Sequence, residues 1–70
     1  MISEITVNTK GGSILTSKYY DFSFHGLSLH GNTVRFFQEK AELTCTELEN
    51  PKHKYYFPYE NINHIEELFI

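Results

Sequence analysis

The side chains of this 70-residue chain that are best suited to bind a metal are four histidines and one cysteine: His25, His30, Cys45, His53 and His64. Imidazole nitrogen and thiolate sulfur are ligands of zinc and nickel, and zinc sites usually contain closely spaced ligand pairs. Only His25 and His30 approach such a spacing. In an unbroken strand they point to opposite faces, although a bend at Gly26 would return them to one side. We interpret both as solvent-facing residues near a hairpin tip, and we expect no metal and no cofactor.

Catalytic chemistry finds little support in the sequence. A nucleophilic cysteine needs a base beside it, but Cys45 continues an alternating apolar run, so we interpret it as a buried structural thiol. The acidic residues form no distinctive pair for glycosidase chemistry. Gly11-Gly12 precedes neither Lys-Ser nor a helical pattern, so it does not resemble a phosphate-binding loop. We therefore predict no catalytic residues and a protein that is not an enzyme.

Charge and hydropathy limit the classes of partner. The net charge is −3, and the six Lys and Arg residues are scattered singly. Double-stranded nucleic acid usually requires a clustered basic face, so we expect none as a partner. No apolar run approaches the roughly 20 residues of a membrane span, and the first ten residues do not resemble a signal peptide. We expect no membrane and a cytoplasmic location.

Composition favours strands over helices. The chain has five tyrosines and six phenylalanines, together with six threonines and six isoleucines. A chain of this length forms one small domain, which we place over residues 1–70. Such a domain buries only about 60% of its unfolded surface. Because one cysteine excludes an internal disulfide, self-association or a metal would have to add stability.

The clearest local pattern is "FSFHGLSLHGNTVRFF", residues 22–37. If Gly31-Asn32 is a two-residue hairpin loop, Leu29 faces Val34 and Leu27 faces Phe36, which places four apolar side chains on one face. The sequence therefore predicts a hairpin with its tip at Gly31-Asn32. In this interpretation Gly26 marks a bulge or a sharp bend.

Other strands follow the same alternation. Ile5 and Val7 indicate a first strand, and Gly11-Gly12 indicates a turn before extended chain from residue 14. Tyr20, Phe22 and Phe24 share one face of a strand, as do Leu43 and Cys45 of another. "ENPKHK" then turns the chain, with Pro51 at the second position of the turn. Residues 38–42 are compatible with a loop or with one helical turn.

The last stretch, "KYYFPYENINHIEELFI", has two possible interpretations. An aromatic strand stops at Pro58 and a short turn follows. Ile62, Ile65 and Leu68 then recur at helical spacing, but the same residues also suit a final strand, and both alternatives bury Ile62 and Ile65.

Residues 54–65 resemble the close of Src-homology-3-like (SH3-like) and Sm-like small barrels. There a strand reaches a proline, makes one 3₁₀ turn and enters the last strand. We accordingly expect a mainly β fold, either a small antiparallel sheet or a partly open barrel of about five strands, with a short helical turn near the C-terminus. The resemblance does not extend to peptide or RNA binding, because the chain has no tryptophan and no basic rim. What the resemblance implies at most is assembly through edge strands, as in the rings of Sm-like proteins.

Two functions remain as hypotheses. In the first, the protein is a non-catalytic β module that binds another protein, with its tyrosines as contact surface. In the second, it sequesters a small anionic ligand such as a nucleotide, and this alternative suits a phage or mobile-element protein directed against host defence. The ligand would contact His25, His30, Arg35, Tyr55 and Tyr59.

The apolar residues at the end of the sequence, Leu68, Phe69 and Ile70, predict self-association. Their exposure would forgo on the order of 1.5 to 3 kcal/mol each if burial were available. An unpaired final strand also offers an edge for docking. We expect a homo-oligomer, most simply a two-fold dimer, with an interface that includes Tyr56, Ile65, Leu68, Phe69 and Ile70.

Overall fold

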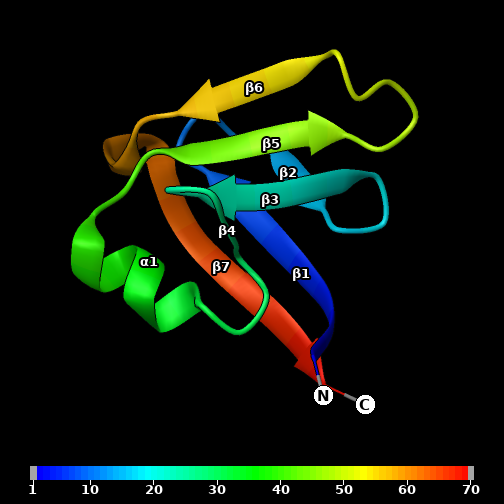
Figure 1. Cartoon of the computed structure of the whole chain (residues 1–70). Coiled ribbons are helices and arrows are strands. Elements are labelled where there is room, and N and C mark those ends of the chain that lie inside the picture. Colours follow the sequence, from blue (N-terminus) through cyan, green and yellow to red (C-terminus); the bar gives the residue numbers. More distant parts are fainter. Residues whose placement is uncertain (1, 70) are drawn as a thin grey trace.

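The computed structural model describes residues 2–69 and contains two antiparallel sheets (Figure 1). One sheet has the order β2-β1-β7 and the other β4-β3-β5-β6. The elements in chain order are β1 (Ile2–Thr9), β2 (Ile14–Thr16), β3 (Tyr20–Phe24), β4 (Leu27–Ser28), α1 (Thr33–Glu39), β5 (Leu43–Glu47), β6 (Lys54–Phe57), the 3₁₀ turn η1 (Tyr59–Asn61) and β7 (Ile62–Phe69). The predicted mainly β, antiparallel fold is confirmed. Among residues 2–69 no strand pairing joins the two sheets, so the arrangement is open.

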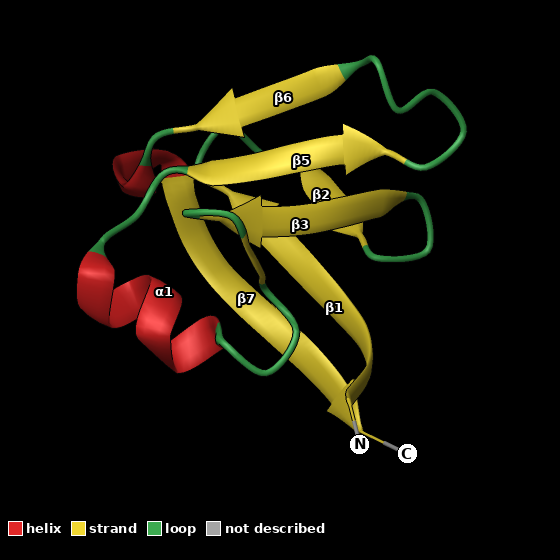
Figure 2. Cartoon of the chain, viewed as in Figure 1, coloured by secondary structure: helices red, strands yellow, loops and turns green. Residues whose placement is uncertain are grey.

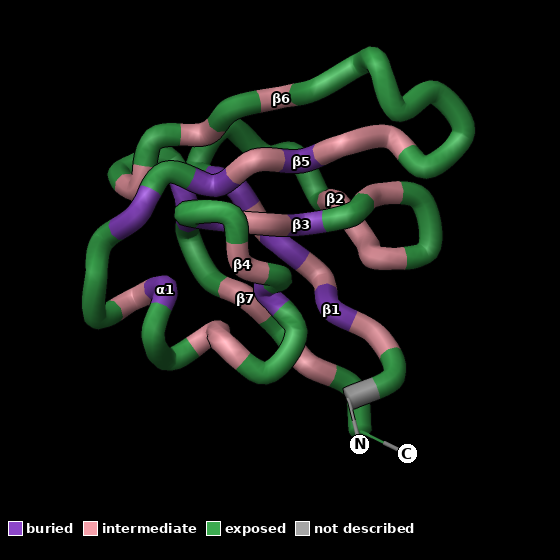
Figure 3. The backbone as a smooth tube through the Cα atoms, viewed as in Figure 1, coloured by how far each residue is buried: buried purple, intermediate pink, exposed green. Residues whose placement is uncertain are grey.

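The hydrophobic core lies between the two sheets (Figure 3). Ile5 and Val7 of β1 face Phe22 and Phe24 of β3 across it, as the alternation of each strand predicted. β5 adds alternate residues from the middle of the larger sheet, including the buried Cys45. Because period-two patterns place one face of each strand in the core, these strands could be predicted from local sequence.

The predicted hairpin at Gly31-Asn32 is wrong. Residues 33–39 form helix α1, beside the sheets in Figure 2. Val34 is 69% exposed, whereas Leu29 and Phe36 are fully buried, so the four apolar residues do not share one face. Leu27 is half-buried and belongs to the short strand β4.

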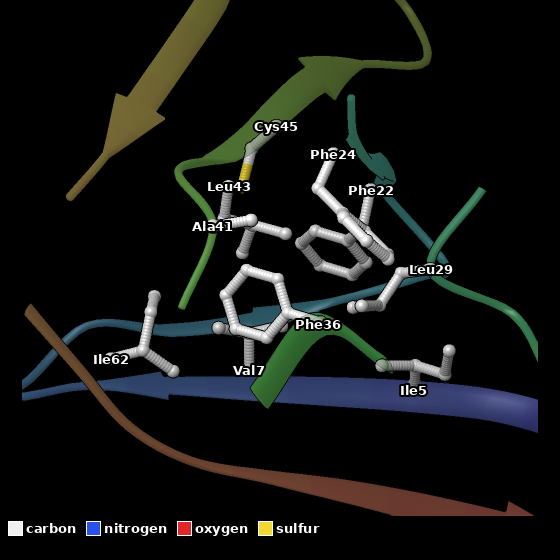
Figure 4. Packing of buried hydrophobic residues seen from close by; sticks show 10 residues of the cluster. All are labelled: Ile5, Val7, Phe22, Phe24, Leu29, Phe36, Ala41, Leu43, Cys45 and Ile62. Atoms are coloured by element: carbon white, nitrogen blue, oxygen red, sulfur yellow. The ribbon is translucent and has the colours of Figure 1, made fainter. Parts of the chain in front are cut away.

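Helix α1 forms because the helical conformation of residues 33–39 buries the Phe36 side chain in the core, and this packing stabilises it. Figure 4 shows the Phe36 ring directed into the core between Val7 and the residues of the larger sheet. Arg35 and Glu39 are spaced four apart and form an ion pair along the helix. The helix ends at Glu39, because Lys40 adopts a left-handed conformation and its N–H bonds back to the carbonyl of Phe36. The segment 38–42 is therefore partly helix and partly loop.

The actual hairpin turn is His25-Gly26. β3 pairs with β4 through Phe24 and Leu27, which leaves these two residues as the loop. Their φ angles are 50° and 75°, and positive φ at both central positions is what a type I′ turn requires. Gly26 is thus part of a tight turn rather than a bulge in a longer strand. The two histidine-glycine pairs both mark turns, since Gly31 also has positive φ in the loop before α1.

The C-terminal stretch follows the strand alternative. Pro58 precedes η1, and the chain enters β7 at Ile62, which is buried. β7 runs antiparallel to β1 over its whole length, so the helical alternative for residues 62–68 is wrong. Ile65 is half-buried. Leu68 and Phe69 are exposed in the single chain, and Ile70 lies outside the described residues.

The turns predicted at Gly11-Gly12 and at Pro51 are both present. The N–H of Gly12 bonds to the carbonyl of Thr9, and the N–H of His53 bonds to that of Asn50 at 2.8 Å, which places Pro51 second in its turn. Within residues 2–69, no helix has the length and apolar character that a membrane crossing requires.

Candidate functional site

The five side chains predicted to bind an anion occupy separate places in the single chain. His25 and Arg35 both contact Glu39, the last residue of α1. His30 is exposed in the loop that precedes this helix. Tyr59 belongs to η1 and packs near the aromatic residues of α1, and Tyr55 lies on β6. A single chain therefore does not assemble them into one pocket.

His25 and Arg35 share a carboxylate. His25 Nδ1 lies 2.9 Å from Oε1 of Glu39, and Arg35 Nε donates to the other oxygen of Glu39. The hydrogen bond from Arg35 is the main reason that the pKa of Glu39 is lowered, and His25 adds to this effect. Because the Glu39 carboxylate already contacts both Arg35 and His25, this corner ties α1 to the His25-Gly26 turn and is poorly suited to an anion.

Tyr59 belongs to the packing around the helix. Its ring centroid lies 5.8 Å from that of Phe36 and 6.1 Å from that of Phe37. Aromatic rings at these separations stabilise one another. The Tyr59 ring therefore packs against the core and is part of its aromatic cluster.

Tyr55 belongs to a different cluster, at the far end of the larger sheet. Its hydroxyl donates to Oε2 of Glu47 at 3.1 Å, and Nδ1 of His53 lies 3.2 Å from Oε1 of the same carboxylate. The Tyr55 ring lies 4.5 Å from the His53 ring and 6.2 Å from the Tyr20 ring. Desolvation raises the pKa of Tyr55, and the bond to the negatively charged Glu47 raises it further.

Strand register brings this cluster together. β3 begins where β5 ends, and Tyr20 pairs with Glu47. Cys45 pairs with Tyr55 on the other side of β5, so Tyr20, Glu47 and Tyr55 share the face that carries the core. Outside the strands, the N–H of Leu48 bonds to the carbonyl of Tyr19 at 3.0 Å and holds two loops together.

An open hollow of about 170 Å³ lies where β3 begins and β5 ends. It is lined by Tyr19, Tyr20, Glu47 and Glu49, and we call it the tyrosine hollow. Tyr19 is 66% exposed, and the adjacent Leu48 is 52% exposed. Two tyrosines and two glutamates therefore line one hollow at one end of the larger sheet.

The sequence analysis did not identify the tyrosine hollow. One local signal was present: Glu47 continues the alternation of Leu43 and Cys45, where an apolar residue is expected. A carboxylate on the core face of a strand requires polar partners or an opening to solvent. Of the other lining residues, Tyr20 begins β3 and Tyr19 and Glu49 lie in loops, so their approach depends on the pairing of β3 with β5.

The side chains predicted to form the interface also lie apart. Tyr56 points to the outer face of β6, opposite Thr44, and is 58% exposed. Ile65, Leu68 and Phe69 belong to β7, which is an edge strand of the other sheet. Ile70 is outside the described residues. A shared interface through both elements would have to cover two sides of the molecule.

Cys45 is a buried thiol, as predicted. Its side chain is fully buried, and desolvation raises its pKa to about 12. Among residues 2–69, no three His, Cys, Asp or Glu side chains come close enough together to hold a metal ion.

The chain has no match among protein-family models, curated proteins or solved structures.

Proposed function

We propose that the protein is a non-catalytic binding module that recognises another protein through the tyrosine hollow. The observation that carries this proposal is that Tyr19 and Tyr20 line a concave, solvent-open site. Tyrosine is enriched at protein interfaces because it offers a large contact area, at a modest cost in side-chain entropy, together with a polar hydroxyl. A concave surface between loops also allows a partner side chain to be enclosed.

Peptide selection tests this proposal. Peptides are selected from a random display library against the wild-type protein, and their affinities are then measured for Tyr19→Ser and Tyr56→Ser. Tyr56 is a matched control, because it is similarly exposed but lies on the outer face of β6. We expect Tyr19→Ser to weaken binding at least about tenfold and Tyr56→Ser to leave it unchanged. Selected peptides that are insensitive to Tyr19→Ser would contradict the proposal.

The homo-oligomer is proposed through the edge strand β7. A two-fold axis perpendicular to a sheet pairs residues that point to the same face. If the axis passes through Ile65, His64 of one copy lies opposite Glu66 of the second copy, and the reverse pair forms as well. An axis through Glu66 would instead place two glutamates together. His64 and Glu66 are both exposed, and they already lie 3.4 Å apart within one chain, which supports the first register.

Light scattering after gel filtration tests this pairing at tens of micromolar protein. We expect a dimer for the wild type, a shift towards monomer for His64→Glu, and recovery of the dimer when His64→Glu is combined with Glu66→Lys. In the double variant, each cross-strand pair of positions 64 and 66 joins an acidic and a basic side chain. A monomeric wild type would exclude the β7 dimer without affecting the peptide experiment.

The alternative function, sequestration of a nucleotide, stays a prediction. Its five side chains would need a second chain to complete a pocket. Because the chain has no tryptophan, excess absorbance of the purified protein at 260 nm would reveal a co-purified nucleotide directly.

A further inference from the structure

We infer that the tyrosine hollow accepts a basic side chain of the partner, and that an arginine guanidinium is its preferred occupant. This inference rests on the proposed function and specifies what its binding site recognises. Its basis is that two tyrosines and two glutamates line one hollow, Tyr19 and Tyr20 with Glu47 and Glu49.

The lining chemistry favours a cation over an anion. The face of a tyrosine ring carries negative potential and attracts a cation placed over it. Carboxylates attract the same cation and repel phosphate. A guanidinium group is planar, so it can stack on a ring and direct its N–H donors towards carboxylate oxygens in the same plane, whereas a lysine ammonium acts as a point charge.

The carboxylates of the hollow retain capacity for a ligand. Among residues 2–69, no hydrogen bond or ion pair is formed by the side chain of Glu49, which is exposed. Glu47 already contacts His53 and Tyr55, but each carboxylate oxygen can accept more than one hydrogen bond.

The neighbouring lysines are directed elsewhere. Lys18 lies 3.8 Å from a carboxylate oxygen of Glu4 on β1. Lys54 donates to the hydroxyl of Thr46 at 3.0 Å, on the outer face of the larger sheet. Neither lysine therefore neutralises the hollow, and the net charge of −3 adds a weak attraction for cationic partners.

A titration followed by NMR tests the inference on the intact protein. The probe is N-acetyl-arginine amide, and the control is N-acetyl-citrulline amide, which has nearly the same shape without the charge. We expect the arginine probe to shift the backbone amides of the four lining residues and to bind at least about tenfold more tightly than the citrulline probe. Added salt should weaken the arginine binding, because the site is open to solvent.

Variants assign the effect to particular groups. Glu49→Gln should weaken binding of the arginine probe, whereas Glu42→Gln should not, because Glu42 is an exposed glutamate just before the opposite end of β5. Tyr19→Leu keeps apolar surface but removes the ring face, so it should also weaken binding. All three positions are exposed, so the variants should remain folded.

The possible outcomes separate the inference from the proposed function. Equal binding of the two probes, or no shift at the lining residues, would overturn the inference. Selected peptides that require Tyr19 but contain no basic residue would overturn it as well and would leave the binding module standing. Arginine binding at the hollow without any peptide that depends on Tyr19 would support the cation site and contradict the proposed protein partner.

Discussion

The hydroxyl of Tyr55 donates a hydrogen bond to Oε2 of Glu47, with 3.1 Å between the two oxygen atoms. The two residues come from the neighbouring strands β5 and β6. Tyr55 pairs with Cys45, and Glu47 is the next residue of β5 that points to the same face. The bond holds the Glu47 carboxylate at the rim of the core, beside the tyrosine hollow. It therefore links the packing of the larger sheet to the geometry of the proposed site.

Replacing this carboxylate should change the titration of Tyr55. Desolvation and Glu47 both raise the pKa of Tyr55 above its usual value of 10.0, with desolvation the larger cause. In Glu47→Gln the negative charge is removed, so we expect the pKa of Tyr55 to fall part of the way back. NMR of tyrosine labelled at the ring carbon that bears the hydroxyl measures this. Glu49→Gln is the control, since Glu49 is not among the groups that raise this pKa. An unchanged titration in Glu47→Gln would contradict the contact.

The helix at residues 33–39 predicts a large difference between two nearby apolar residues. Phe36→Ala should lower the free energy of unfolding by about 3 to 5 kcal/mol, because it empties a fully buried site. Val34→Ala should change it by no more than about 0.5 kcal/mol, because Val34 faces solvent. Urea unfolding followed by circular dichroism measures both. Equal costs at the two positions would favour the hairpin instead.

Cys45 should be unreactive in the folded protein. Its burial and its pKa of about 12 leave almost no accessible thiolate at pH 8, where a free cysteine reacts readily. We expect a thiol reagent to modify Cys45 only as fast as the protein opens, and to react at once in concentrated urea. Burial of the neutral thiol contributes stability that is complete below the usual pKa of 9.0 and is lost as pH rises towards about 12. Rapid modification without denaturant would show that β5 is not a buried strand.

Glu39 should make stability depend on pH in the acid range. Its pKa is lowered below the usual value of 4.5, mainly by the hydrogen bond from Arg35. The charged form is favoured in the folded state, so its contribution is present above pH 4.5 and is lost as pH falls through the folded pKa. We therefore expect Glu39→Gln to be less stable than the wild type at neutral pH, with the difference vanishing in strong acid. Urea unfolding across this range measures the effect.

Glu42→Gln serves as the control for this experiment. Glu42 is exposed, and its side chain forms no ion pair within residues 2–69. Its replacement should leave stability nearly unchanged at neutral pH. A loss equal to that of Glu39→Gln would assign the effect to net charge rather than to the contact with Arg35 and His25.

Local sequence determined the strands whose pattern admits one interpretation. The alternation of Ile5 with Val7, and of Phe22 with Phe24, specifies both the strand and its buried face, because a strand repeats every two residues. Pro58 fixed the end of β6 for a similarly local reason, since proline cannot continue a strand ladder and favours the turn that follows. The mainly β class followed from these patterns together.

Tertiary structure decided between local alternatives that the sequence pattern supports equally well. His25-Gly26 and Gly31-Asn32 are both competent turn signals, and the choice between them depends on whether Phe36 reaches the core from a strand or from a helix. The tyrosine hollow depends on the same kind of selection, because Tyr20 meets Glu47 only through the pairing of β3 with β5. Residues far apart in the chain carry no periodic signal for each other. Their approach is determined by the burial free energy of the whole core, which acts on all strands at once.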